Sequence, residues 1–227
     1  MFRIMQRAAT GHRAKARYGT NLTVEISSFI KLLSMKKYFL PWLLLAATVV
    51  QAQPWTKQYD FVDDCICGLA KVSKDGKFGY VDQQGKLIVP VIYQEGMAFS
   101  EGFAAVKTEN KWGYLDSTGK MVINPEYEEA GSFHESLAAV RKNGKFGFID
   151  KNNKLVIPFN YSMANGFSEG MAPVANDKDM WGYVNASGKL VIPCVFTFAD
   201  KFEDGRARVI KGSEMSYIDR YGKAVKD

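Results

Sequence analysis

Residues 111–126 read KWGYLDSTGKMVINPE, and four features of this stretch return along the chain. They are an aromatic-Gly-aromatic run, an Asp three residues before Gly-Lys, a short aliphatic run, and a proline. The segment 77–92, KFGYVDQQGKLIVPVI, carries the same features 34 residues earlier. A fixed period of this length is the sequence signature of a repeat architecture.

Five units of about 34 residues account for the chain from residue 59 onward. Each unit is taken to begin at an aromatic residue, which gives the boundaries 59–92, 93–126, 127–160, 161–195 and 196–227. The glycines that recur between two aromatics are Gly79, Gly113, Gly147 and Gly182. The acids that recur three residues before Gly or Asn are Asp82, Asp116, Asp150 and Asp219, with Asn185 in the fourth unit. We interpret both sets as structural positions of the repeat.

Each unit is predicted to form a three-stranded antiparallel meander. Runs such as 111–115 and 120–123 are short, apolar or alternating, and bounded by turn formers, as strands are. The pair 143–144, Asn-Gly, lies between two such runs and favours a tight hairpin. The recurring acids can accept hydrogen bonds from backbone N–H groups in the turns that follow them. The proline is expected to end the third strand, because proline cannot donate to a ladder.

The glycine between two aromatics is predicted to leave room for a ring or backbone of a neighbouring unit. One meander buries too little apolar surface to be stable alone, whereas five stacked meanders cover one another's faces. The predicted fold class is therefore all-β, a tandem array of five three-stranded β-meander repeats. An open curved or superhelical array is favoured, and a closed five-bladed propeller-like ring is the alternative.

The coordinated recurrence of Trp/Phe-Gly, Asp-x-x-Gly-Lys, Ile-Pro and Glu-Gly-x-Ala resembles the WG repeat family, also called KWG repeats, found mainly in bacterial proteins. The resemblance covers residues 59–227 and departs from the pattern at Asn153 and Ser216, where glycine is expected. It implies an all-β repeat module of the kind often found in envelope or exported proteins. It implies no enzymatic activity.

The first 52 residues are expected to be separate from the repeats. Residues 1–34 are interpreted as an upstream mis-start, with translation beginning at Met35, or as a disordered basic extension. Residues 35–52 have the pattern of a signal peptide: two lysines, the apolar run FLPWLLLAATVV, and Ala52 before the predicted cleavage. That apolar run is too short to span a bilayer, so no stable membrane span is expected after cleavage.

The overall charge of +6 comes from the N-terminal leader and not from the repeats. Eight of the 30 Lys and Arg and one of the 24 Asp and Glu lie in residues 1–52. Residues 53–227 therefore hold 22 bases and 23 acids, a net charge of −1. A nucleic-acid partner, which requires a basic surface, is not expected.

No catalytic or metal-binding motif is recognised in the repeats. His134 is the only histidine after residue 52, and Cys65, Cys67 and Cys194 are too few for a zinc site of four thiolates. Cys65 replaces a Phe of the repeat and is expected to be buried, and Cys65 or Cys67 could pair with Cys194. The recurring acids Glu101, Glu135, Glu169 and Glu203 are interpreted as residues of the fold.

The sequence favours a non-catalytic, periplasmic or secreted protein that acts as a binding or scaffold module for a protein partner in the bacterial envelope or exterior. The alternative is a glycan- or peptidoglycan-binding module, whose candidate stacking residues are Trp112 and Trp181. A hydrolase is a remote alternative. No cofactor is expected.

Overall fold

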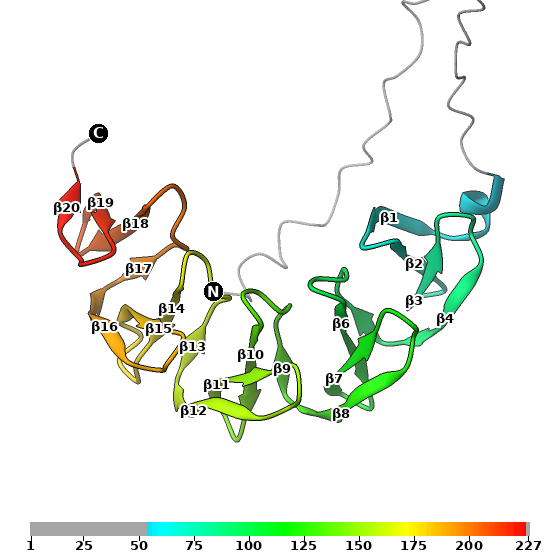
Figure 1. The fold of residues 1–227 in the computed structure, drawn as a ribbon, viewed down its shortest axis with the longest axis horizontal. Helices are drawn as coiled ribbons and strands as arrows, with labels where there is room; N and C mark the ends of the chain where they lie inside the picture. Colours follow the sequence, from blue (N-terminus) through cyan, green and yellow to red (C-terminus); the bar gives the residue numbers. More distant parts are fainter. Residues whose placement is uncertain (1–53, 226–227) are drawn as a thin grey trace, which may run out of the picture. The chain divides into compact units, whose positions relative to one another are not determined.

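The computed structural model describes residues 54–225. The predicted leader, its signal peptide at 35–52 and the cleavage after Ala52 lie outside the described residues. Within 54–225, the chain forms a short 3-10 helix, η3 (Pro54–Gln58), followed by five four-stranded antiparallel sheets in chain order (Figure 1). The sheets follow one another in tandem without closing into a ring. The predicted all-β fold class and the favoured open array are therefore confirmed.

The five sheets have closely matched strand boundaries. The first is β1 (Phe61–Ile66), β2 (Leu69–Lys74), β3 (Lys77–Asp82) and β4 (Leu87–Tyr93). The second is β5 (Glu95–Gly96), β6 (Phe103–Thr108), β7 (Lys111–Asp116) and β8 (Met121–Tyr127). The third is β9 (Glu129–Ala130), β10 (Leu137–Lys142), β11 (Lys145–Asp150) and β12 (Leu155–Tyr161). The fourth is β13 (Met163–Ala164), β14 (Met171–Ala175), β15 (Trp181–Asn185) and β16 (Leu190–Phe196). The fifth is β17 (Phe198–Ala199), β18 (Arg206–Lys211), β19 (Glu214–Asp219) and β20 (Ala224–Val225).

The connecting segment of each repeat supplies a strand that the predicted three-stranded meander lacked. In the second sheet this strand is Glu95–Gly96, which pairs with Lys107 and Val106 of β6. A two-residue strand leaves no readable alternation in the sequence, so periodicity could not reveal it. Each repeat is accordingly a four-stranded sheet, and Tyr93 and Tyr127, taken above as the first residues of units, are the last residues of β4 and β8.

The core lies between successive sheets. Tyr80 of β3 is fully buried, and its ring meets Phe99, in the segment that leads into β6, with centroids 5.0 Å apart. Its hydroxyl donates a hydrogen bond of 2.6 Å to the Met97 carbonyl. The same tyrosine–phenylalanine contact recurs at Tyr114–Phe133 and Tyr183–Phe202. These rings join each sheet to the next, as expected of repeats that cannot bury their faces alone.

The prolines lie inside strands and do not end them, which corrects the prediction made from their chemistry. Pro90 is the fourth residue of β4, an edge strand, so its missing N–H costs no ladder hydrogen bond. Around it, Phe78 of β3 is opposite Tyr93, and Tyr80, two residues later, is opposite Val89, four residues away from Tyr93. β4 therefore contains a bulge of two extra residues. Bulges and prolines on an edge also hinder unwanted strand pairing.

The glycine between the aromatics faces this bulge. A Cβ at Gly79 would lie 2.6 Å from the Val89 carbonyl oxygen, and a Cβ at Gly147 would lie 2.6 Å from that of Ile157. The close approach therefore comes from the edge strand of the same sheet, and not from a neighbouring unit as predicted. Glycine is needed because any side chain would push the edge strand away.

The first and fifth sheets differ from the others on their outward faces. Trp55 and Tyr59 pack against the buried Val72 and Val81 of the first sheet, where later sheets have a preceding sheet. The fifth sheet has Arg208 opposite Tyr217, whereas the second has Ala105 opposite Tyr114. Arginine is tolerated there because this face is not covered by a sheet within the described residues. The altered motif of the fifth repeat, residues 215–217, thus suits an exposed face.

Candidate functional site

The recurring acids hold the turn between the third and fourth strand of each sheet. In the first sheet, Asp82 Oδ1 accepts hydrogen bonds of 2.9 Å from the Gln84 and Lys86 N–H groups. The Gly85 N–H donates to the Asp82 carbonyl at 3.0 Å. Equivalent bonds are made by Asp116, Asp150, Asn185 and Asp219. These side chains are committed to backbone groups of their own turns.

The same turns contact the preceding sheet. A Cβ at Gly119 would lie 3.0 Å from the Ile88 carbonyl oxygen of β4, and one at Gly222 would lie 3.3 Å from Ile192 of β16. At Asn153, which replaces glycine, the side-chain oxygen accepts a hydrogen bond of 2.6 Å from the Tyr127 hydroxyl of β8. The turns of the later sheets therefore lie against the edge strand of the sheet before, and the turn of the first sheet lies against Trp55 of η3.

A second set of acids connects consecutive sheets. In three junctions, a glutamate on the turn before the second strand accepts a hydrogen bond from a backbone N–H in the equivalent turn of the next sheet. The donors and acceptors are Ser136 N and Glu101 Oε2 at 2.9 Å, Gly170 N and Glu135 Oε2 at 2.9 Å, and Gly205 N and Glu169 Oε2 at 3.0 Å. We name Glu101, Glu135 and Glu169 the carboxylate ladder.

The ladder position in the first and fifth sheets is not glutamate. It is marked by a positive φ, which is 50° at Glu101, 53° at Cys67 and 53° at Asp204. The equivalent residue of the fifth sheet is therefore Asp204, and the prediction that grouped Glu203 with Glu101, Glu135 and Glu169 is wrong by one residue. Cys67 supplies no carboxylate to the first junction.

The two tryptophans predicted to stack on sugars lie in the core. Trp112 is 7% exposed and Trp181 is 5% exposed. Trp112 belongs to the cluster between the second and third sheets, and Trp181 to the cluster between the fourth and fifth. Neither indole presents a ring face on which a sugar could stack.

The cysteines and the histidine do not assemble a reactive centre. All three cysteines are free, with Cys65 and Cys67 on the first sheet and Cys194 on β16 of the fourth, so the disulfide considered from sequence is not formed. Cys65 is exposed, contrary to expectation, because β1 is longer than its counterparts and bulges between Val62 and Cys65. Within residues 54–225, no group of three or more His, Cys, Asp and Glu is placed to hold a metal ion.

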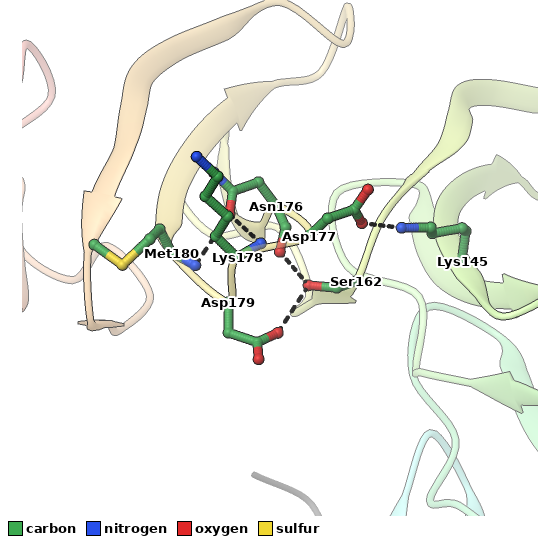
Figure 2. Close-up of polar contacts among 7 residues, drawn as sticks. All are labelled: Lys145, Ser162, Asn176, Asp177, Lys178, Asp179 and Met180. Carbon is green, nitrogen blue, oxygen red and sulfur yellow. Dashed lines mark hydrogen bonds and ion pairs between the residues drawn. The ribbon is translucent and has the colours of Figure 1, made fainter.

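The fourth repeat has one extra residue within the segment 177–179, where its hairpin forms a turn of a different kind (Figure 2). Asn176 Oδ1 accepts hydrogen bonds from the Lys178 and Met180 N–H groups at 2.9 and 3.1 Å. Asp179 has a φ of 56° and its N–H donates to the Asn176 carbonyl at 2.9 Å. The turn thus copies the Asp-x-x-Gly turns, with Asn176 in the place of Asp and Asp179 in that of Gly.

This turn also joins two sheets. Asp177 forms an ion pair with Lys145 of β11, and Ser162 donates a hydrogen bond of 2.5 Å to the Asn176 carbonyl (Figure 2). Its side chains are therefore held by neighbours within the array. The turn is an additional junction between the third and fourth sheets.

The surface feature that repeats without a structural partner is a set of exposed aliphatic side chains on the edge strands. Leu87, Leu155 and Leu190 are the first residues of β4, β12 and β16, and each is 42–47% exposed. The equivalent residue of the second sheet is Met121, which is half-buried. We name the three leucines the aliphatic row. Sequence reasoning missed it, because a run such as Leu-Ile-Val reads equally well as a buried strand.

Burial raises the pKa of Tyr80, Tyr114 and Tyr183, so these side chains remain neutral hydrogen-bond donors inside the core.

In residues 54–225 we find no helix of the length and hydropathy needed to cross a membrane.

The fold and its recurring residues define a tandem β-repeat protein. A family model described as "WG containing repeat" matches residues 78–112, 112–146, 146–178 and 181–214, which together make up more than half of the chain. The chain belongs to this WG-repeat family. No curated protein matches it.

Several solved structures are similar in fold at low sequence identity. Kluyveromyces lactis Hsv2 is 10% identical, with a TM-score of 0.47, over 70% of this chain and 58% of its own. The WD40 β-propeller domain of Doa1 is 10% identical, with a TM-score of 0.43, over 74% of this chain and 67% of its own. A eukaryotic initiation factor is 11% identical, with a TM-score of 0.49, over 73% of this chain and 53% of its own.

Proposed function

We propose that the protein is a non-catalytic scaffold that binds a partner protein through the aliphatic row. The observation that carries this proposal is the recurrence of exposed Leu87, Leu155 and Leu190 as the first residue of three edge strands. Contiguous exposed apolar side chains on a soluble surface mark interaction sites. Repeat arrays use such surfaces to hold extended partners on a rigid support.

Catalysis is left out of the proposal because the recurring polar side chains already have structural tasks. The acids of the turns accept hydrogen bonds from their own backbone, and the carboxylate ladder accepts hydrogen bonds from the next sheet. The polysaccharide alternative relied on Trp112 and Trp181, whose rings are buried, so a protein partner is favoured.

The aliphatic row would contribute only part of the affinity. Full burial of a leucine is worth about 1.5–3 kcal/mol, so covering a half-exposed one contributes about 1 kcal/mol. Three such contacts contribute about 3 kcal/mol, which does not cover the free-energy cost of association. Polar contacts beside the row must supply the remainder.

The proposed place of action is the bacterial periplasm or exterior. It rests on the signal-peptide pattern of residues 35–52. The partner would accordingly be a protein of the envelope or of the extracellular medium.

The proposal is tested by chemical cross-linking of the full-length protein in its cell of origin, followed by denaturing purification. The Leu155→Ser/Leu190→Ser variant should lose the cross-linked partner. The matched control is Phe61→Ser/Ile66→Ser, which removes two exposed apolar residues from β1, at the opposite edge of the first sheet. Retention of the product in the leucine variant, or equal loss in both folded variants, would refute the proposal.

A further inference from the structure

One exposed lysine follows each Asp-x-x-Gly turn, and these lysines form a second row. They are Lys86, Lys120, Lys154, Lys189 and Lys223, one in each sheet. Their backbone N–H groups are bonded to the turn side chains, which fixes where each residue stands. We name these five residues the lysine row.

The ammonium groups of the lysine row have no ion-pair partner within residues 54–225. Lysines elsewhere on the same sheets do have one: Lys107 Nζ lies 2.7 Å from Glu95 Oε1, and Lys142 Nζ lies 2.5 Å from Glu126 Oε2. The lysine row is therefore set apart by its regular placement and by the absence of a direct ion pair within these residues.

The two rows run together along the array. Lys86, Lys154 and Lys189 directly precede Leu87, Leu155 and Leu190 in the chain. The turn of one sheet also lies against the edge strand of the sheet before it, as the Gly119–Ile88 contact shows. An exposed lysine and an exposed leucine are thus adjacent in the first, third and fourth sheets, whereas Lys120 of the second sheet precedes the half-buried Met121.

We propose that this combined strip binds an extended, acidic segment of the partner protein, with carboxylates on the lysine row and aliphatic side chains on the aliphatic row. The inference rests on the proposed function and specifies the chemistry of the partner. Charge complementarity of this kind contributes mainly to specificity and to the rate of association.

A protein segment is favoured over a membrane surface or a nucleic acid. The turn acids Asp82, Asp116 and Asp150 stand in the same turns as Lys86, Lys120 and Lys154, and residues 53–227 have a net charge of −1. Anionic bilayers and nucleic acids attract proteins through an excess of basic charge, which this domain lacks. Individual ion pairs with a segment that follows the strip require no such excess.

The spacing of the sheets sets the repeat of a suitable segment. Packed sheets lie about 10 Å apart, and four extended residues span about 13 Å. Four residues are therefore long enough to reach from one sheet to the next, so a segment with an acidic and an aliphatic residue every four positions can offer one pair to each sheet. Several weak contacts on one chain then act together.

The test uses a fluorescein-labelled peptide of four Glu-Leu-Gly-Ser repeats and measures its fluorescence anisotropy with the full-length protein. Control peptides replace Glu by Lys or Leu by Ser. We expect the Glu-Leu peptide to bind at least tenfold more tightly than either control, with an affinity that falls as salt rises from 50 to 300 mM. Lys154→Glu/Lys189→Glu should weaken it at least tenfold, whereas Lys154→Arg/Lys189→Arg should bind nearly as well as the wild type.

The matched control variant is Lys74→Glu/Lys77→Glu, which reverses two opposed lysines at the β2–β3 hairpin, away from the strip. It should change peptide affinity less than twofold. Equal binding of the three peptides, or equal loss in both charge-reversal variants, would overturn the inference. Sedimentation of the protein with phosphatidylglycerol vesicles, without binding of the peptide, would overturn it in favour of a membrane.

The cross-linking experiment separates this inference from the proposed function. If Leu155→Ser/Leu190→Ser loses the cross-linked partner while Lys154→Glu/Lys189→Glu retains it, the scaffold function stands and the acidic segment is refuted. If the leucine variant retains the partner, both are refuted.

Discussion

The Gly170 N–H donates to both carboxylate oxygens of Glu135, at 2.9 and 3.1 Å, across the boundary between the third and fourth sheets. Glu101 and Glu169 make the same kind of contact at the junctions on either side. The carboxylate ladder therefore links turn to turn, while aromatic rings fill the space between sheets. The stability of the array should therefore depend on both the carboxylate ladder and the aromatic contacts between sheets.

Replacing one ladder acid by its amide should weaken the array. Glu135→Gln keeps the side-chain shape but removes the charge, and a hydrogen bond to a charged group is worth more than a neutral one. Because Glu135 is exposed, we expect a loss of only about 0.5–1 kcal/mol in urea unfolding of the full-length protein. Glu203→Gln, one residue away from the ladder position, should change little; an equal loss there would contradict the role of the ladder.

Restoring the missing ladder position should stabilise the protein. Cys67 has a φ of 53°, as Glu101 has one of 50°, so Cys67→Glu can adopt the same turn and reach the second sheet. We expect a gain of about 0.5–1 kcal/mol. Cys67→Lys provides the control, because it has a long side chain without an acceptor. If both variants are equally stable by urea unfolding, the carboxylate does not act as described.

Acid should loosen the junction at Glu101. Burial works to raise the pKa of Glu101, but the Lys151 ammonium, 3.0 Å away, and the Ser136 N–H outweigh it and hold the pKa below its ordinary value. A carboxyl group with a lowered folded-state pKa stabilises the fold above its unfolded pKa of about 4.3. That contribution is lost as pH falls through the folded pKa.

The lowered pKa of Glu101 can be checked by NMR titration of its carboxyl group. Lys151→Met removes the ammonium and should raise the pKa of Glu101 toward its ordinary value. The difference in stability between wild type and variant should shrink between pH 6 and pH 3. A pKa that does not move in Lys151→Met would contradict the assignment.

The glycines opposite the edge bulge should tolerate no side chain. Gly147→Ala would place a Cβ 2.6 Å from the Ile157 carbonyl oxygen, so the edge strand must shift, at a cost of about 1–3 kcal/mol. Gly131→Ala is the control, because its Cβ would lie 3.5 Å from the nearest atom, an ordinary contact. Thermal unfolding should separate the two variants; similar melting temperatures would argue against the close approach.

Much of the fold could be predicted from the sequence, because the repeat makes each position visible several times. The turn role of Asp82 and the tolerance of Asn153 for a left-handed conformation follow from their chemistry, and Asn153 has a φ of 62°. The position of Pro90 inside a strand could not be predicted, because sequence does not tell that β4 is a bulged edge. The strand Glu95–Gly96 is too short to leave a pattern.

The candidate site could not be predicted from the sequence. Trp112 was predicted to stack on sugars because it is a large aromatic residue, yet its place in the repeat is a core position between two sheets. The exposure of Leu87 and Leu155 could not be predicted, because their aliphatic runs do not show which side chains the neighbouring sheet covers. Cys65 was expected to replace a buried Phe, but the longer β1 leaves it exposed.

The most direct test of the central claim is site-specific photo-cross-linking in the cell of origin. A benzophenone amino acid is placed at Leu155 in the aliphatic row, and in a second strain at Ile66, which is similarly exposed on β1. Binding through the aliphatic row predicts a discrete cross-linked protein from position 155 and none from position 66. A product from position 66 alone, or none from position 155, would contradict it.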